Sequence, residues 1–185
     1  MRIITGTARG RRLETLAGED TRPTAQRVKE GLFSAIQFEL EGRRVLDLFA
    51  GSGQLGLEAL SRGAESCVFV DKNAAAAEVA RRNLRHTGMD DRGQVLSRDA
   101  MTYLQGCGTF DLVFLDPPYA SGLLIPALEA VAVHVSPGGL IVCETDAPDA
   151  LPARAGAFAA DRTYRYGKIF VRLYRVPSEN EVIDG

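Results

Sequence analysis

The chain has 185 residues, of which 45% are hydrophobic and 25% are charged, a composition typical of a globular protein that buries a core. Its formal net charge of -2 excludes a global attraction to nucleic acid, so a nucleic-acid partner would need a local basic patch. The three cysteines, Cys67, Cys107 and Cys143, lack metal-ligand spacing, and no apolar run resembles a secretory leader or reaches membrane-spanning length; we therefore expect no metal, no membrane partner and a cytoplasmic location.

The first 42 residues are predicted to form an extension ahead of the main domain. Arg2–Thr5 and Arg11–Thr15 flank Gly6–Gly10, which predicts a β-hairpin. Basic side chains gather on this hairpin: Arg2, Arg9, Arg11 and Arg12. A helix follows, with apolar residues at helical spacing: Val28, Leu32, Phe33 and Ile36. The arginines make the hairpin a candidate RNA arm, and the alternative is that they are solvated surface charges.

Residues 43–176 alternate between strand and helix patterns. Strands are predicted at Val45–Phe49, Cys67–Val70, Gln94–Ser97, Phe110–Leu115 and Leu140–Glu144. The predicted helices are Gln54–Arg62, a helix capped by Asn73 that ends near His86, Ala100–Gln105, and Leu123–Val135, with a turn after it at Ser136–Gly139. Alternating units of this length predict an α/β, Rossmann-like fold with a mostly parallel sheet and helices on both faces.

The end of the chain departs from this alternation. Asp161–Tyr166 and Lys168–Val176 alternate in side-chain character and meet at Gly167, which predicts an antiparallel hairpin that brings the sheet to seven strands. Pro177–Gly185 is predicted to be an acidic tail. The expected organisation is thus an extension (residues 1–42), one main domain (residues 43–176) and a tail (residues 177–185).

A glycine-rich loop joins the first strand of the main domain to its helix. Gly51 and Gly53 let the backbone approach a ligand, and the amino end of the following helix points N–H donors toward it. The run satisfies the G-x-G-x-x-G pattern, and an acidic residue, Asp71, ends the next strand twenty positions after Gly51, where a carboxylate can bind ribose hydroxyls. These features alone fit a dinucleotide-binding dehydrogenase as well as a methyltransferase.

Two further carboxylates favour the methyltransferase. Asp47 precedes the glycines, where it would repel a pyrophosphate but attract the cationic methionine part of S-adenosylmethionine. Asp99 follows the third strand and can accept a hydrogen bond from an adenine amino group. The alternative is that these side chains cap helices or are solvated strand ends. The predicted cofactor-binding residues are Asp47, Phe49, Gly51, Gly53, Asp71, Asp99 and Ala100.

The tetrapeptide Asp116-Pro117-Pro118-Tyr119 follows the fourth strand. Each proline pushes the residue before it into extended geometry, so the tetrapeptide ends the strand. One carboxylate, rigid carbonyls and one aromatic ring are thereby placed at the carboxyl edge of the sheet. This set suits a planar amino group on a base, because oxygens accept its N–H hydrogens and the ring of Tyr119 offers a stacking face. We therefore predict that Asp116, Pro117, Pro118 and Tyr119 form the catalytic site.

These motifs make the sequence similar to the bacterial RsmD-type methyltransferases. The resemblance extends over nearly the whole chain, through Arg2–Gly6, Arg9–Leu13, Thr21–Thr24, Arg27–Glu30, Asp47–Gly63 and Asp116–Tyr119. The glycine loop and the tetrapeptide are shared by many amino-methyltransferases, whereas the Arg-Pro-Thr segment and the basic hairpin are more particular. Lys29 stands where arginine is frequent in the family, which keeps the charge but not the fork geometry.

The resemblance implies a class I methyltransferase fold and transfer of a methyl group from S-adenosylmethionine to the exocyclic N2 of a guanine in small-subunit ribosomal RNA, a step of ribosome biogenesis. The RNA partner would be either free or part of an assembling small subunit. The resemblance also implies that Arg22, Thr24 and Arg27 lie near the mouth of the active site. The predicted RNA-binding residues are Arg9, Arg11, Arg12, Arg22, Thr24 and Arg27.

Three other functions compete with this prediction. A DNA adenine N6-methyltransferase would use the same tetrapeptide, but such enzymes usually carry an added target-recognition region, and only the short extension is left for one here. A nicotinamide-dependent oxidoreductase would share the glycine loop but leaves Asp116–Tyr119 unexplained. A non-catalytic RNA-binding protein would not need the complete set of polar groups.

Overall fold

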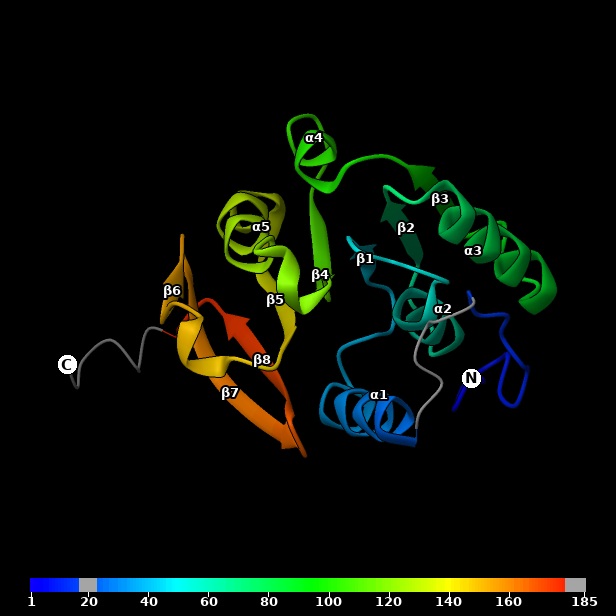
Figure 1. Cartoon of the computed structure of the whole chain (residues 1–185), viewed down its shortest axis with the longest axis horizontal. Coiled ribbons are helices and arrows are strands. Elements are labelled where there is room, and N and C mark those ends of the chain that lie inside the picture. The colour runs from blue at the N-terminus through cyan, green and yellow to red at the C-terminus, as the bar shows by residue number, and fades with distance from the viewer. Residues whose placement is uncertain (17–22, 179–185) are drawn as a thin grey trace.

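The structure, a computed structural model, describes residues 1–16 and 23–178. Its described strands form one sheet in the order β3-β2-β1-β4-β5-β8-β7-β6, with helices packed on both sides (Figure 1). The strands are β1 (Arg44–Asp47), β2 (Ser66–Asp71), β3 (Gly93–Ser97), β4 (Phe110–Leu115), β5 (Val135–Thr145), β6 (Arg154–Ala155), β7 (Phe158–Tyr166) and β8 (Ile169–Arg175). The helices are α1 (Pro23–Ala35), α2 (Gln54–Ser61), α3 (Ala74–Thr87), α4 (Ala100–Leu104), α5 (Leu124–Val131) and the short 3-10 helices η1 (Tyr119–Ser121), η2 (Ala132–His134) and η3 (Pro148–Ala150).

Strands β1 to β5 run parallel, and β8 is antiparallel to both of its neighbours, β5 and β7. The carboxyl ends of the parallel strands therefore lie at one edge of the sheet, and the helices that follow them return toward the opposite edge. This arrangement confirms the predicted Rossmann-like class I methyltransferase fold with its antiparallel C-terminal hairpin. Gly167 turns that hairpin with a φ of 67°, a left-handed conformation that favours glycine.

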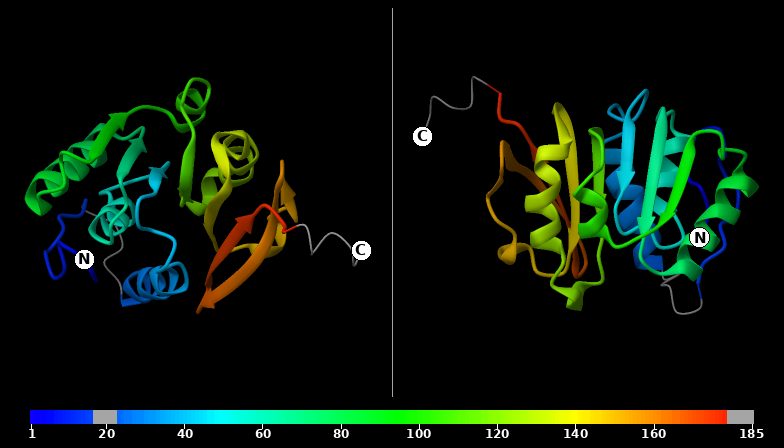
Figure 2. Two further views of the ribbon diagram at one scale, coloured as in Figure 1. Left: turned by 180° about the vertical axis from the view of Figure 1, so that it is seen from behind. Right: turned by 90° about the horizontal axis from the view of Figure 1, so that it is seen from above.

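Each face of the sheet has its own apolar core, because side chains alternate between the faces along each strand. On one face, α1, α2 and α3 pack over Val45 and Phe69. On the other, α4 and α5 pack over Leu46 and Val70. Figures 1 and 2 show the twisted sheet between these two layers. Neighbouring residues such as Val45 and Leu46 point to opposite faces, and both faces are buried. The strand is therefore continuously apolar in the sequence.

Three details of the sheet differ from the prediction. The described sheet has eight strands rather than seven, because the two residues of β6 add to the edge of β7. The helix predicted to reach Val135 ends at Val131 and continues as η2. The turn predicted at Ser136–Gly139 lies within β5, which pairs with β4 through a shift in register that accommodates the Pro-Gly-Gly sequence.

The N-terminal segment (residues 1–16) has the topology of the predicted hairpin but one bridge rather than two strands. Arg2 pairs with Arg12, and the Ile3 N–H donates to the Arg11 carbonyl (3.0 Å). The Leu13 N–H also donates to the Met1 carbonyl (3.0 Å), and other N–H groups of the segment bond to α2, such as that of Thr7 to the Ser61 carbonyl (2.8 Å). At the turn, a Cβ on Gly6 would lie 1.7 Å from the Ser61 carbonyl oxygen, so only glycine allows this close approach.

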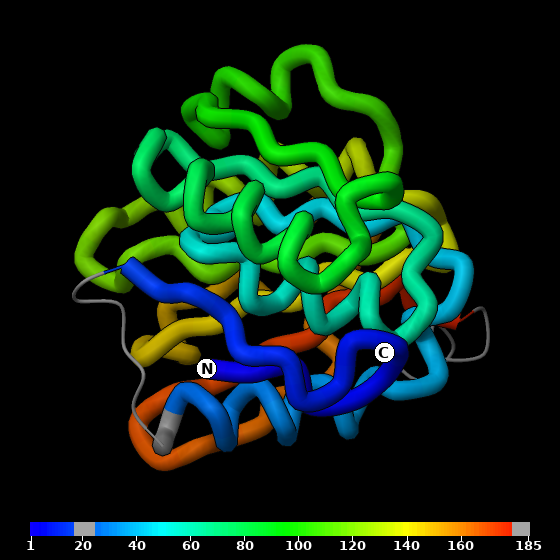
Figure 3. Tube along the Cα trace, turned by 90° about the vertical axis from the view of Figure 1, so that its right-hand side faces the viewer, coloured from blue at the N-terminus to red at the C-terminus, as the bar shows by residue number. Residues whose placement is uncertain are grey.

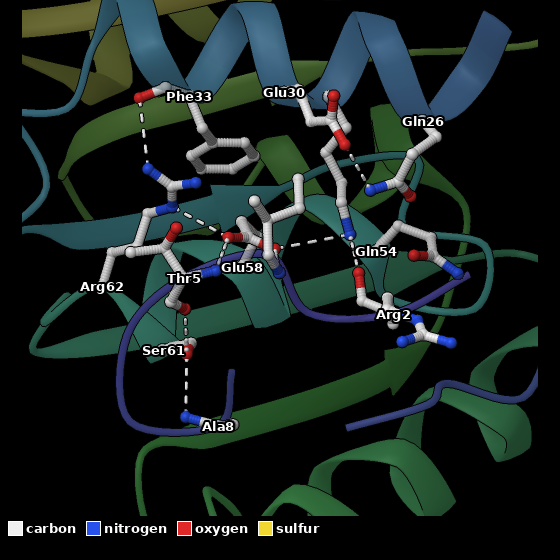
Figure 4. Close-up of polar contacts among 12 residues, drawn as sticks. Arg2, Thr5, Ala8, Gln26, Glu30, Phe33, Gln54, Glu58, Ser61 and Arg62 are labelled. Atoms are coloured by element: carbon white, nitrogen blue, oxygen red, sulfur yellow. Dashed lines mark hydrogen bonds and ion pairs between the residues drawn. The ribbon is translucent and has the colours of Figure 1, made fainter. Parts of the chain in front are cut away.

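A buried ion cluster ties this segment to the main domain (Figure 4). Glu58 of α2 is fully buried and accepts hydrogen bonds from the backbone N–H groups of Ile4 (2.9 Å) and Thr5 (3.1 Å). It also pairs with Arg62 (2.8 Å) and with Lys29 of α1 (3.4 Å). Lys29 is 3% exposed, and burial lowers its pKa although the charge of Glu58 opposes the shift.

Lys29 also donates to the Arg2 carbonyl (2.8 Å), so the lysine makes specific contacts without the fork geometry of arginine. The N-terminal segment (residues 1–16) is therefore packed against both α1 and α2. Within residues 1–16 and 23–178, no helix is long and apolar enough to cross a membrane. Thr21, Arg22 and residues 179–185 of the predicted tail lie outside the described residues.

Candidate cofactor and active site

Four aspartates follow the carboxyl ends of neighbouring parallel strands. Asp47 ends β1, Asp71 ends β2, Asp99 comes just after β3, and Asp116 comes just after β4. Because the strand order is β3-β2-β1-β4, these positions are consecutive along one edge of the sheet. The structure thus brings together the carboxylates that the sequence placed at successive strand ends, at the edge where open α/β sheets bind ligands.

Asp47 lies beneath the glycine loop. It is 2% exposed, and its Oδ2 accepts the backbone N–H of Gly56 (2.9 Å). Burial raises the pKa of Asp47 to about 7; the hydrogen bond from Gly56 opposes the shift and the charge of Asp71 adds to it. A cationic ligand at this edge would offset the cost of charging Asp47.

Asp71 holds the other side of the same loop. Its Oδ2 accepts the N–H of Gly51 (2.8 Å), and its Oδ1 accepts the N–H of Asn73 (2.8 Å). Gly53 adopts a φ of 87° at the N-cap of α2 and has no side chain to cap the helix, whose Gly56 N–H is bound by Asp47. The loop and the first turn of α2 are therefore held by two carboxylates, and the remaining N–H donors of that turn are available to a ligand.

Asp99 caps α4, as the alternative interpretation of this residue allowed. Its Oδ1 accepts the N–H (2.9 Å) and the hydroxyl (3.1 Å) of Thr102, and these hydrogen bonds lower its pKa. The side chain is exposed, so the cap does not remove it from a ligand at this edge. Of the two other predicted cofactor residues, Ala100 is buried and Phe49 is half-buried against the core.

The tetrapeptide forms an acidic site with Glu144, at the end of β5. Tyr119 is 45% exposed, and its hydroxyl donates to Glu144 Oε1 (2.8 Å). The pKa of Asp116 is raised well above its ordinary value, first by burial and then by the charges of Glu144 and Asp47. Burial also raises the pKa of Glu144, while the hydrogen bond from Tyr119 opposes the shift. A donor-rich or cationic ligand would stabilise these carboxylates in their charged forms.

A cavity of about 170 Å³ opens beside the tetrapeptide. The buried Pro117, the exposed Pro118 and Tyr119 line one side of it. The remaining wall is mainly apolar and comes from the start of α5 and the loop after β5: Leu124, Ile125, Ala147, Ala150 and Leu151. The site therefore combines carboxylates at the strand ends with an apolar surface next to them.

Two residues of the site region escaped the sequence analysis. Glu144 was placed in a strand from the sequence without being given a role in the site. Its acidic side chain at the end of the strand that follows Asp116 was the signal that could have indicated one. Asn83 of α3 is 1% exposed and accepts the Glu14 N–H (2.8 Å) while donating to the carbonyls of Glu14 (3.0 Å) and Ser52 (2.9 Å). Asn83 thus joins the N-terminal segment to the glycine loop, and no local pattern around it indicates this role.

The predicted RNA-binding residues do not form one group. Arg9, Arg11 and Arg12 are exposed on the N-terminal segment, and Arg11 donates to the carbonyl of His86 in the last turn of α3. Because α3 returns from the carboxyl ends of the strands, its last turn lies at the opposite edge. Figure 3 shows the turn of the N-terminal segment at the far end of the molecule from the start of α1.

The second part of the predicted RNA surface is only partly described. Arg27 is exposed in the first half of α1, whose Gly31 packs against Tyr166 at the carboxyl end of β7. Since β7 runs parallel to β5, Arg27 lies toward the same edge as Asp116. Arg22 lies outside the described residues, and the side chain of Thr24 is also not described.

The sheet order, the clamped glycine loop and the acidic tetrapeptide define a class I, S-adenosylmethionine-dependent methyltransferase. Residues 1–175 match the model of the family described as "Conserved hypothetical protein 95". The chain is 33% identical over 184 residues to the ribosomal RNA small subunit methyltransferase D of Escherichia coli (strain K12), covering 98% of this chain and 92% of that protein. The chain belongs to this RsmD family.

Solved structures agree with this assignment. The yhhF protein of Escherichia coli superposes with a TM-score of 0.85 and 32% identity, covering 96% of this chain and 99% of that one. The Thermus thermophilus 16S rRNA N2 G1207 methyltransferase (RsmC), solved with AdoMet and guanosine, has a TM-score of 0.71 at 22% identity and covers 88% of this chain and 45% of that one. The second likeness is one of fold alone.

Proposed function

We propose that this protein transfers the methyl group of S-adenosylmethionine to the exocyclic N2 amine of a guanine in small-subunit ribosomal RNA. Membership of the RsmD family supports the methyl donor and the RNA. The choice of the guanine amine rests on one observation, the acceptor-rich site in which Asp116 and Glu144 lie beside Tyr119. Guanine presents adjacent N–H donors on its Watson–Crick edge, and this site presents acceptors.

The residues at the carboxyl ends of β1, β2 and β3 fit S-adenosylmethionine. Gly51 and Gly53 bring backbone donors close to it, Asp71 accepts ribose hydroxyls through lone pairs that the loop N–H groups leave free, and Asp99 accepts from the adenine amine. In the described part of the chain, Gln54 Oε1 at the start of α2 is a buried acceptor without a partner, which suits an ammonium donor. Asp47 favours the positive charge from below the loop.

The bound S-adenosylmethionine supplies an electrophilic methyl group on a positively charged sulfur. The guanine N2 lone pair is delocalised into the ring, so the amine is a weak nucleophile. Asp116 and the Pro117 carbonyl accept the two N–H hydrogens and turn the lone pair toward the methyl group. As the nitrogen–carbon bond forms and the sulfur–carbon bond breaks, the positive charge moves to the nitrogen, where Asp116 stabilises it. The surplus proton then leaves to Asp116 or to water.

Tyr119 would hold the base in place. Its ring is partly exposed beside the cavity and its hydroxyl is anchored on Glu144, so one face can stack on a purine. The target guanine must lie unpaired or leave its stack to reach Asp116 from an RNA helix. Binding by stacking therefore orients the amine, and the strand-end carboxylate acts on it.

We also propose that residues 1–42 carry much of the RNA affinity and that residues 43–176 carry the chemistry. Among the hairpin arginines, Arg11 contacts the last turn of α3, and this helix of 14 residues spans about 20 Å. Phosphates bound there would lie several nucleotides from the target base, whereas Arg27, Arg22 and Thr24 would serve nucleotides near it. The substrate is either free RNA or an assembling small subunit, and the protein would meet both in the cytoplasm.

The test is to methylate RNA from a strain that lacks this gene. Purified protein and labelled S-adenosylmethionine are incubated with free small-subunit RNA and, separately, with small subunits from that strain, and the modified nucleosides are identified by mass spectrometry. N2-methylguanosine at one position, formed in either arm, is the expected result. N6-methyladenosine, or transfer to DNA but not to RNA, would refute the proposal. Calorimetry completes the test, because binding of NAD without binding of S-adenosylmethionine would favour the oxidoreductase instead.

A further inference from the structure

Glu144 and Asp116 sit side by side at the ends of adjacent strands. The last paired positions of β4 and β5 are Leu115 and Cys143, so the next residue on each strand is one of these two carboxylates. Side chains in register on parallel neighbours point to the same face of a sheet, and adjacent strands lie about 4.8 Å apart. The charge of Glu144 accordingly helps to raise the pKa of Asp116. Two acceptors with this spacing can meet neighbouring donors on one ligand.

Glu144 has an oxygen to spare for that ligand. Its Oε1 accepts the Tyr119 hydroxyl (2.8 Å), and within residues 1–16 and 23–178 no hydrogen bond to Oε2 is formed. The side chain is half-buried and next to the cavity that Tyr119 and Thr145 line. A carboxylate in this position needs a hydrogen-bond donor when a bound base shields it from solvent, because burying an unpaired charge is costly.

The neighbouring atoms of the two purine amines differ at the position that Glu144 would meet. Guanine carries N1–H, a donor, next to its N2 amine, whereas adenine carries N1 with a lone pair next to its N6 amine. When the exocyclic amine is bound to Asp116, the N1–H of guanine would donate a hydrogen bond to Glu144. Adenine in the same position would instead place the lone pair of its N1 against the Glu144 carboxylate. Sites built to bond an N–H reject analogues that lack it far more strongly than apolar pockets reject a missing methylene.

We propose that Glu144 determines base specificity by accepting the N1–H of the target guanine while Asp116 engages its N2 amine. This role rests on the proposed guanine-N2 function and adds Glu144 to the residues that contact the base. The competing explanation is that Glu144 only positions the Tyr119 ring through their hydrogen bond. The two explanations predict different responses to a base analogue and to the Tyr119→Phe variant.

The experiment uses RNA with either guanine or 2-aminopurine at the target position, as free RNA or in a reconstituted small subunit, whichever the wild-type protein methylates. 2-Aminopurine keeps the exocyclic amine but has a lone pair at N1. For the wild type, we expect kcat/KM to be about 10- to 100-fold lower on 2-aminopurine than on guanine. In Glu144→Gln, activity on guanine should fall and this preference should shrink to a few-fold, because the glutamine amide can donate to the N1 of the analogue.

Tyr119→Phe is the matched control. It removes the hydroxyl that binds Glu144 but leaves the carboxylate, so the preference for guanine over 2-aminopurine should stay as in the wild type. Thermal melts and S-adenosylmethionine affinity check that each variant folds and binds its cofactor. If Glu144→Gln lowers kcat/KM on both bases equally, or if Tyr119→Phe loses the preference to the same extent, the inference is wrong. A wild-type protein that does not methylate guanine would instead refute the proposed function itself, before the variants are compared.

Discussion

Replacing Asp47 by asparagine should stabilise the ligand-free protein at pH 8. Asp47 is 2% exposed, and the asparagine carbonyl can still accept the Gly56 N–H while carrying no charge. The folded-state pKa of about 7 lies above the ordinary value of 3.8, so the folded protein binds more protons than the unfolded chain between these values. The stability contributed by protonated Asp47 is therefore present below about pH 4 and is lost as the pH rises through 7.

The size of the effect follows from this difference in pKa. At about 1.4 kcal/mol per pKa unit, a change from 3.8 to about 7 sets an upper bound of about 4 kcal/mol. We expect on the order of 1–3 kcal/mol, because Asp71 can rearrange and water can enter near the loop. The same substitution should weaken S-adenosylmethionine binding, since a negative charge near a cationic ligand is removed.

Urea unfolding of the ligand-free protein at pH 5 and pH 8 measures this prediction. The difference in unfolding free energy between Asp47→Asn and the wild type should grow as the pH rises. Asp99→Asn is the control, because Asp99 is exposed, its pKa is lowered, and asparagine can still cap α4. If the difference in unfolding free energy between Asp47→Asn and the wild type is the same at both pH values, burial does not raise the pKa of Asp47.

Three further predictions follow from the site and the N-terminal segment. Asp116→Ala should reduce kcat by about 100-fold or more with little change in cofactor affinity, and retained turnover with weaker cofactor binding would make Asp116 a binding residue instead. Glu58→Ala should lower the free energy of unfolding, measured in urea, by about 3–5 kcal/mol because Lys29 is left buried without its partner. As a control, Glu78→Ala removes an exposed carboxylate and should lower it by less than about 1 kcal/mol. Equal losses for the two variants would argue against the stabilising role of the buried cluster. Replacing Arg9, Arg11 and Arg12 together should weaken RNA binding and reduce the slope of its salt dependence by about 0.7–0.9 log units per lost phosphate contact. An unchanged slope would show that these arginines do not contact phosphate.

Local chemistry in the sequence predicted most of the edge where the site lies. Two prolines had to end the apolar strand at Asp116, the glycines had to form the turn before α2, and Asn73 caps α3 as expected. Strands that alternate with helices are parallel, and parallel strands share an edge. The residues that follow successive strands could therefore be placed together without coordinates, although their roles stay predictions.

Other features depended on packing between distant segments. The hydrogen bond from Tyr119 to Glu144 joins positions 25 apart, and Asn83 contacts Glu14, 69 positions away. The segment carrying Arg11 could be recognised as basic, but its place at the edge opposite Asp116 follows from where it docks on α2 and α3. Nothing in the period of a strand or helix specifies which side chain of another element will face it.

The sequence by itself thus determined the fold class and the acidic ends of the parallel strands, because these depend on periodicity, chain stiffness and capping within a few residues. The tertiary structure decided that Glu144 completes the acidic site, that Glu58 is buried with Lys29, and that the N-terminal segment is fixed to the domain. These arrangements minimise the cost of buried polar and charged groups over the whole molecule, and that free energy depends on every element that surrounds them.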